Sequence, residues 1–197
     1  IHFNRNGFWS VRRCEIVPCT DKSVGITTVY LYLDKHLLLL FNESNTHSIQ
    51  SEEKSKLLIN DEHHQQQQRE MQRSILGKYI HLWIWEISAW ESHPFSITEL
   101  TLPDRHTVKM RLDVKETGKV NGAWAGRLNW LADSDEPVSV LARFDGPFGS
   151  VTVPLDQPSQ IVKYDAVLMF AGGIGVTALS SMMHYCSQYN PNTQLIW

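Results

Sequence analysis

Short stretches of alternating hydrophobic and polar residues dominate the first three quarters of the chain. Such alternation is typical of strands with one buried face, and it predicts strands over residues 24–33, 79–87, 108–114 and 138–144. Turn signals separate these runs, at Pro103-Asp104, Thr117-Gly118, Asn121-Gly122 and Asp145-Gly146-Pro147. One short helix is predicted over residues 126–132. Several short strands with turns between them predict an antiparallel barrel or sandwich.

A polar segment interrupts this pattern. Residues 42–73 contain the run Gln65–Gln68 and the pair His63-His64, with almost no aromatic residue. The composition predicts a flexible insertion or a solvated helix between two strands. Adjacent histidines do not share a helix face, so a metal site there is disfavoured.

The pattern changes again after residue 160. The continuous apolar run 166–170 predicts a strand buried on both faces. A glycine turn follows, and residues 178–189 have apolar side chains at helical spacing until Asn190-Pro191. Residues 194–197 start another strand, so we predict the first half of a βαβ unit. The uncharged stretch 166–183 contains three glycines, which favours strand, turn and helix over a membrane span, and we expect no transmembrane helix within the chain.

Composition narrows the function classes. Of the 197 residues, 42% are hydrophobic and 20% charged, and the net charge is −3, so we expect a globular chain that does not bind nucleic acid. Three cysteines, an odd number, argue against a disulfide scaffold and suit a reducing compartment. Cys14 and Cys19 lack a second pair of ligands at metal-site spacing, which favours free thiols.

Two local motifs suggest chemistry. The segment A-G-G-I-G-V-T-A, which begins at Ala171, contains G-x-G-x-x-A between a predicted strand and a predicted helix. Glycines there let the backbone approach a ligand, and the N–H groups at a helix start favour an anion, although a structural turn without a ligand is the alternative. H-P-F-S at residues 93–96 offers an aromatic face and a hydroxyl, as a flavin site requires; the alternative is a strand end with a core phenylalanine.

The order of these motifs, with D-G-P-F-G at residues 145–149 between them, resembles the ferredoxin-reductase-like flavoenzymes. H-P-F-S, D-G-P-F-G and G-K-Y-I at residues 77–80 resemble the dehydrogenase domain of membrane ferric reductases and NADPH oxidases in particular. The resemblance implies an FAD-binding antiparallel Greek-key β-barrel over residues 10–155, with the insertion at about 42–74. The start of a Rossmann-like NAD(P)-binding α/β domain follows over residues 160–197, and we expect it to be truncated.

The resemblance also implies site residues. Those for FAD are His93, Pro94, Phe95, Ser96, Arg111, Trp124 and Ala125. Gly146 is a further cofactor-binding candidate, in the segment 145–149 that would shape the junction between the two domains. Phe95 would lie against the isoalloxazine, Ser96 near its N5, and Arg111 near the phosphates. G-A-W-A at residues 122–125 stands where the family usually has G-D-W-T, so contacts there would come from backbone N–H groups.

Those for the nicotinamide dinucleotide are Gly172, Gly173, Gly175 and Thr177, with Thr177 near the nicotinamide. Ser96 and Thr177 are the candidate catalytic residues, and we expect no metal ligand.

The implied function is an NAD(P)H-dependent FAD oxidoreductase. Hydride would pass from NAD(P)H to FAD, and single electrons would pass on to a haem in an upstream membrane domain, with ferric iron or dioxygen as the final acceptor. The region would belong to a larger membrane-associated protein and face the cytoplasm. An inactive remnant or interaction fragment, and a soluble flavin reductase, are the alternatives. NADH and NADPH are not distinguished, and we expect the isolated chain to bind FAD weakly and NAD(P)H hardly at all.

Overall fold

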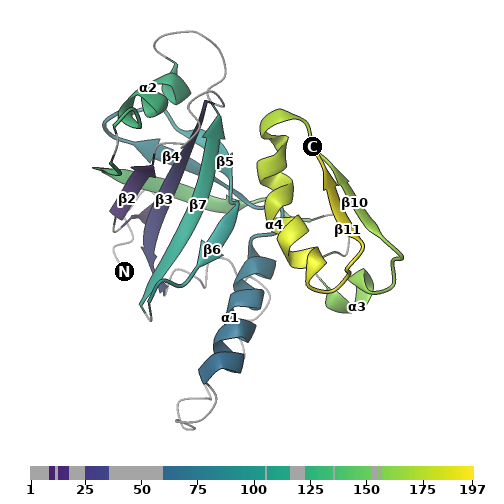
Figure 1. Cartoon of the computed structure of the whole chain (residues 1–197). Helices are drawn as coiled ribbons and strands as arrows, with labels where there is room; N and C mark the ends of the chain where they lie inside the picture. Colours follow the sequence, from purple (N-terminus) through teal and green to yellow (C-terminus); the bar gives the residue numbers. More distant parts are fainter. Residues whose placement is uncertain are drawn as a thin grey trace.

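The computed structural model describes residues 9–11, 13–17, 25–35, 60–104, 106–115, 123–134, 136–151, 155 and 157–197. The strands are β1 (Trp9–Ser10), β2 (Arg13–Val17), β3 (Ile26–Asp34), β4 (Tyr79–Ile84), β5 (His93–Ser96), β6 (Glu99–Thr101), β7 (Thr107–Lys115), β8 (Val138–Val140), β9 (Ala142–Phe148), β10 (Val167–Phe170) and β11 (Thr193–Ile196). The helices are α1 (Asn60–Ser74), α2 (Trp124–Leu131), α3 (Pro158–Ile161), the 3₁₀ turn η3 (Gly173–Gly175) and α4 (Val176–Ser187) (Figure 1).

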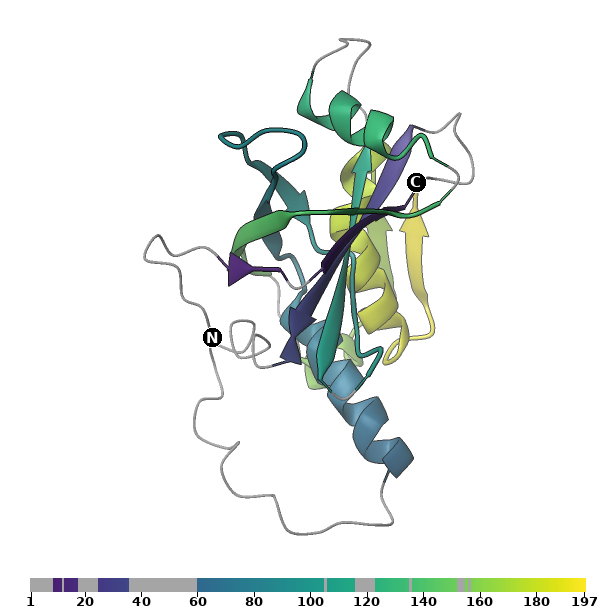
Figure 2. The same cartoon turned by 90° about the vertical axis from the view of Figure 1, so that its left-hand side faces the viewer.

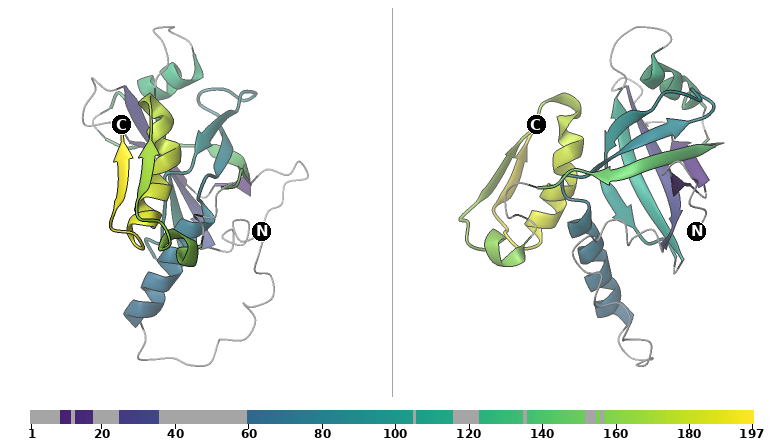
Figure 3. Two further views of the ribbon diagram at one scale, coloured as in Figure 1. Left: turned by 90° about the vertical axis from the view of Figure 1, so that its right-hand side faces the viewer. Right: turned by 180° about the vertical axis from the view of Figure 1, so that it is seen from behind.

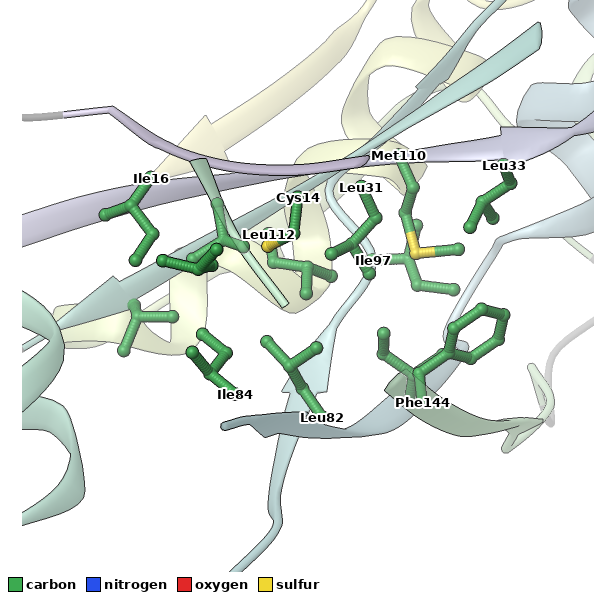
Figure 4. Close-up of a cluster of buried hydrophobic side chains, with 14 of the residues drawn as sticks. Cys14, Ile16, Leu31, Leu33, Leu82, Ile84, Ile97, Met110, Leu112 and Phe144 are labelled. Carbon is green, nitrogen blue, oxygen red and sulfur yellow. The ribbon is translucent and has the colours of Figure 1, made fainter. Parts of the chain in front are cut away.

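Two antiparallel sheets enclose the main hydrophobic core. One has the order β6-β7-β3-β2-β8 and the other the order β1-β9-β4-β5. Every second residue of their long strands points inward, so side chains of the first sheet meet those of the second (Figure 4). The facing residues include Cys14, Leu31 and Leu112 on one side and Leu82, Ile84 and Phe144 on the other. The predicted antiparallel architecture is confirmed, whereas closure into a barrel is not shown by the strand pairs of the described residues.

Strands with strict alternation lie where the sequence predicts them. Both β3 and β7 are nine residues long and alternate between half-buried and buried positions. Strand β7 is one residue longer at each end than the predicted strand 108–114. Strand β3 begins two residues after the start of the predicted strand 24–33 and ends one residue after its end. The predicted strand 79–87 ends three residues earlier, at Ile84.

The prediction of a single strand over residues 138–144 is wrong. Two strands lie there, because β8 pairs with β2 in one sheet and β9 pairs with β4 in the other. The exposed Leu141 separates them. The predicted turn at Asp145-Gly146-Pro147 is also wrong, since these residues continue β9. Tyr79 of β4 pairs with Phe148, and His81 pairs with Asp145, so two residues along β4 correspond to three along β9. The extra residue of β9 forms a β-bulge, and the ladder continues through Gly146 and Pro147.

Helix α1 covers the edge of the larger sheet. Side-chain amides of Gln68 and Gln72 both donate to the carbonyl of Leu100 in the edge strand β6, at 2.8 and 2.9 Å. The C-terminal part of α1 is therefore buried, with Met71 and Gln72 only 4% and 3% exposed, while its other end projects away from the sheets (Figure 2). A helix is confirmed in the polar segment, but it is not solvated throughout. Residues 42–59 of the predicted insertion lie outside the described residues.

The C-terminal part is a β-α-β unit. Strands β10 and β11 pair in parallel, as the sequence predicts, and α4 lies between them and the face of β7 (Figures 1 and 3). Val167 and Met169 are buried in a second core cluster with Tyr185 and Cys186 of α4. The prediction that this strand is buried on both faces is wrong, because the described elements cover one face only and leave Phe170 68% exposed.

Candidate functional site

The motif H-P-F-S forms the edge strand β5 of the smaller sheet. In its register with β4, His93 and Phe95 are opposite the buried Leu82 and Ile80, whereas Ser96 is opposite the exposed Tyr79. Because paired residues share a face of the sheet, Phe95 lies on the inner face and Ser96 on the outer face. A flat ligand contacts both of these side chains only if it lies across the free edge of β5.

Trp124 packs against the inner side of this motif. Its ring centroid lies 5.1 Å from that of His93 and 5.4 Å from that of Phe95. The side chain is 4% exposed, and its indole Nε1 has no hydrogen-bond partner among the described residues. A buried N–H without an acceptor costs free energy, so this position favours a ligand that supplies one.

Trp124 is also the first residue of α2, whose N-terminus has further unpaired donors. The N-cap residue Ala123 provides no side-chain hydrogen bond, and neither it nor Ala125 can accept one. No side chain of the described residues caps the first backbone N–H groups of α2, and an anion such as phosphate suits these donors. Arg127 holds α2 beside the loop after β4, since its Nη1 donates to the carbonyl of Ile87 at 2.7 Å and its Nη2 to Glu91 at 2.8 Å. The residues of this region fit the pyrophosphate of a dinucleotide.

Arg111 lies on β7, and Thr98, two residues after the end of β5, links the two strands. The backbone N–H and the hydroxyl of Thr98 both donate to the carbonyl of Arg111, at 3.0 and 2.9 Å. Burial alone would lower the pKa of the Arg111 guanidinium, but the Asp113 carboxylate reverses this and raises it. Arg111 therefore stays charged beside the motif.

A cavity of about 240 Å³ lies between the larger sheet and α4. Its lining is polar and comes from α1, β7, α4 and the segment Thr98-Glu99; it consists of Gln72, Thr98, Glu99, Arg111, Asp113, Ser180 and His184. The sequence indicated Arg111 but not Asp113, Ser180 or His184. The signal that could have found Asp113 is its spacing of two from Arg111, which puts both on the same face of a strand.

Gly146 belongs to an aromatic cluster on the outer side of the smaller sheet. The rings of Tyr79, His81 and Phe148 lie 5.7–5.9 Å apart. Gly146 has φ +121°, and a Cβ on it would lie 3.2 Å from the carbonyl of Tyr79. Backbone packing thus accounts for this glycine. The sequence signal for the cluster is the alternation of aromatic residues along β4.

The three glycines before α4 lie in open space. Gly172, Gly173 and Gly175 are exposed, and a Cβ on any of them would meet no described atom within 4 Å. Only Gly173, with φ +53°, has a backbone conformation that favours glycine. Neither packing nor conformation explains the other two.

The carbonyl groups of this turn are engaged within the protein. Those of Gly172, Gly173 and Ile174 accept from Gly175 N at 3.0 Å, Trp197 Nε1 at 2.9 Å and Thr177 Oγ1 at 2.8 Å, respectively. The groups left for a ligand are the backbone N–H groups at the start of η3 and α4. The hydroxyl of Thr177 uses its proton on the turn itself and can only accept a hydrogen bond from a ligand.

The structure thus brings His93, Phe95 and Trp124 into contact, and Thr98, two residues after β5, bonds the carbonyl of Arg111. The glycine turn and Thr177 lie at the start of α4, the helix whose Ser180 lines the cavity with Arg111. In the described part of the chain, no cluster of His, Cys, Asp and Glu side chains could hold a metal ion. No helix within the same residues is long and apolar enough to cross a membrane.

Comparisons with known proteins find matches over the same region of the chain. Residues 62–152 match a family described as an FAD-binding domain. The chain is 28% identical over 122 residues to a superoxide-generating NADPH oxidase heavy chain of Dictyostelium discoideum, and the match covers 55% of this chain and 21% of that protein. It is 32% identical over 120 residues to human NADPH oxidase 4, covering 55% of this chain and 19% of the relative. It is 26% identical over 117 residues to the mitochondrial ferric reduction oxidase 8 of Arabidopsis thaliana, and the match covers 57% of this chain and 14% of that relative.

The chain therefore spans about a fifth or less of the length of each of these relatives. The matched segment contains β4 to β9, α2, the H-P-F-S and D-G-P-F-G motifs, and Arg111. By sequence, residues 62–152 thus match an FAD-binding domain, and the chain is similar to parts of NADPH oxidases and of a ferric reduction oxidase.

Proposed function

We propose that the protein is a flavoprotein oxidoreductase that passes electrons from NAD(P)H through FAD to a haem or metal acceptor. The two sheets then form the Greek-key barrel of an FAD domain over residues 10–155, and residues 160–197 begin a Rossmann-like nucleotide domain. The haem belongs to an upstream membrane domain, and the described region faces the cytoplasm as part of a membrane-associated protein. Relatives named NADPH oxidase and ferric reduction oxidase support this proposal.

The observation that carries the proposal is the indole N–H of Trp124, which has no hydrogen-bond partner within the described part of the chain. It is buried against His93 and Phe95, within the segment that matches an FAD-binding domain. A chain that only kept the fold would gain by replacing this tryptophan with an apolar ring, because the unpaired donor is a cost without a ligand. A phosphate oxygen of FAD would remove that cost.

Bound FAD supplies the redox chemistry, since it accepts a hydride and releases electrons singly. The protein binds and orients the two cofactors. His93, Phe95 and Trp124 provide an apolar wall at the edge of β5, and Ser96 provides a hydroxyl on the other side of that edge. The N–H groups at the starts of α2 and α4 would each hold a phosphate group, and Thr177 would lie near the nicotinamide.

The first test is a flavin titration of the full chain by equilibrium dialysis, with the variant Trp124→Phe. The wild-type chain should bind FAD saturably though weakly. Trp124→Phe keeps the ring but removes the N–H, so it should weaken FAD binding by roughly tenfold, the value of one hydrogen bond to a charged group. Its thermal stability should change little, because the loss of the unpaired donor offsets the packing lost with the smaller ring. Unchanged FAD affinity in this variant would exclude the indole as a ligand, and absence of saturable FAD binding by the wild type would contradict the proposed function.

The glycine turn gives a second test. Gly172→Ala and Gly175→Ala should leave the free energy of unfolding within about 0.5 kcal/mol, since neither Cβ meets another described atom. Both should weaken further the slight NAD(P)H binding expected of this chain, measured by isothermal titration in FAD-saturated protein at high NAD(P)H concentration, because the methyl groups would occupy the space where the pyrophosphate approaches. Val176→Ala, one residue further along, is the matched control for a change at the helix start and should bind NAD(P)H as the wild type does. Full NAD(P)H affinity in both glycine variants would assign the turn a purely structural role.

A further inference from the structure

Asp113 lies two residues beyond Arg111 on β7 and holds its guanidinium. Arg111 Nε lies 3.1 Å from Asp113 Oδ1, and the hydroxyl of Thr28 on β3 donates to the same oxygen at 2.8 Å. Thr28 and Asp113 are direct partners in the β3–β7 ladder, so the carboxylate is fixed by the sheet itself. Its side chain is 14% exposed, compared with 40% for Arg111.

This arrangement uses one edge of the guanidinium and leaves the other available. The contact goes through Nε, and the two Nη groups form no hydrogen bond with another described residue. Arg111 and Asp113 both line the cavity beneath α4. A guanidinium binds phosphate through a planar fork of N–H groups, so fixing Nε sets the direction of the remaining fork.

We propose that Asp113, supported by Thr28, is a positioning residue that orients Arg111 toward a phosphate of FAD. This inference rests on the proposed FAD-binding function and on the expectation from sequence that Arg111 lies near the phosphates of FAD. The carboxylate contacts no ligand itself, and its effect on binding is exerted through the rotamer of Arg111.

The charge of Asp113 makes the proposal distinguishable from simple electrostatics. A carboxylate beside an anion site repels the anion, so removing it should strengthen FAD binding if charge alone mattered. If the carboxylate instead acts by orienting Arg111, removing it should weaken FAD binding. Glu99 offers a matched comparison, because its carboxylate lines the same cavity and its residue pairs with Arg111 in the β6–β7 ladder, whereas the hydrogen bond to the guanidinium comes from Asp113.

The experiment compares the binding of FAD and of riboflavin, which has no phosphate, to the full chain, four single variants and one double variant. Arg111→Ala should weaken FAD binding by about 10–100-fold and leave riboflavin binding unchanged. Asp113→Ala should weaken FAD binding by roughly tenfold, also without an effect on riboflavin, and should add nothing in the Arg111→Ala background. Glu99→Ala should leave FAD binding unchanged or strengthen it. Asp113→Asn keeps the acceptor oxygen and should restore most of the affinity.

The outcomes distinguish a failure of the positioning role of Asp113 from a failure of the proposed function. Equal or stronger FAD binding by Asp113→Ala overturns the positioning role, as does an Asp113→Asn variant as weak as Asp113→Ala. An equal loss of riboflavin affinity in Asp113→Ala also overturns it, because a disturbed fold affects both ligands. Wild-type protein that binds FAD no better than riboflavin contradicts the phosphate site of the proposed function itself.

Discussion

Replacing Phe144 with alanine should lower the free energy of unfolding by about 3–5 kcal/mol, the range found for large aromatic residues in cores. Phe144 is fully buried, and it extends from β9 of the smaller sheet toward the side chains of the larger one (Figure 4). Its truncation would leave a cavity between two sheets that cannot collapse, because their ladders fix their spacing. Urea unfolding followed by circular dichroism measures the change.

Leu141, three residues earlier and 69% exposed, provides the control. Leu141→Ala should change the free energy of unfolding by no more than about 0.5 kcal/mol. Phe144→Leu keeps much of the volume and should lose less than half as much as the alanine variant. A loss below about 1 kcal/mol in Phe144→Ala would mean that the two sheets do not share one core in solution.

Gly149→Ala should also be strongly destabilising. Gly149 has φ +90°, and a Cβ there would lie 2.7 Å from the carbonyl oxygen of Gly77. The backbone conformation alone costs about 1–3 kcal/mol for a residue with a side chain, and the collision with another backbone adds to this. Thermal unfolding should therefore show a clearly lower midpoint, and the yield of soluble protein should be smaller.

Gly172→Ala is the matched control, because that glycine has open space around it and φ −120°. The two substitutions add the same methyl group, so a difference between them reports the positive φ of Gly149 and its close approach to Gly77 together. If both variants were equally stable, the close approach of Gly149 to Gly77 would not exist in solution. The last glycine of D-G-P-F-G thus has a packing reason that requires no cofactor.

The spacing of hydrophobic residues correctly predicted the strands and the helix that bury one face along their whole length. The alternation in β3 and β7 and the helical spacing in α4 each reflect burial on a single face, which the sequence records directly. The errors arose where the burial depends on distant elements. Residues 138–148 change from one sheet to the other at Leu141, and no local property of V-S-V-L-A-R-F marks the change. Likewise, the hydrophobicity of β10 could not reveal that one of its faces is uncovered by the described elements.

The candidate site was predicted as a set of motifs but not as an arrangement. Resemblance supplied His93, Phe95 and Trp124, and only the fold shows that Trp124 contacts both of the others. The placement of Phe95 and Ser96 on opposite faces follows from strand register, which single-chain patterns do not fix. Asp113 was missed because its role depends on Thr28, 85 residues away in the chain.

Helix α1 is anchored to the larger sheet near its C-terminal end, where Gln68 and Gln72 both bind the carbonyl of Leu100. Those two amides occupy an acceptor that an edge strand would otherwise present to the strand of another molecule. The chain before them can consequently lengthen, shorten or change composition without altering the sheet. Relatives of this protein should therefore differ most in length just before α1, while a side chain able to donate toward the β6 carbonyl is retained at its end.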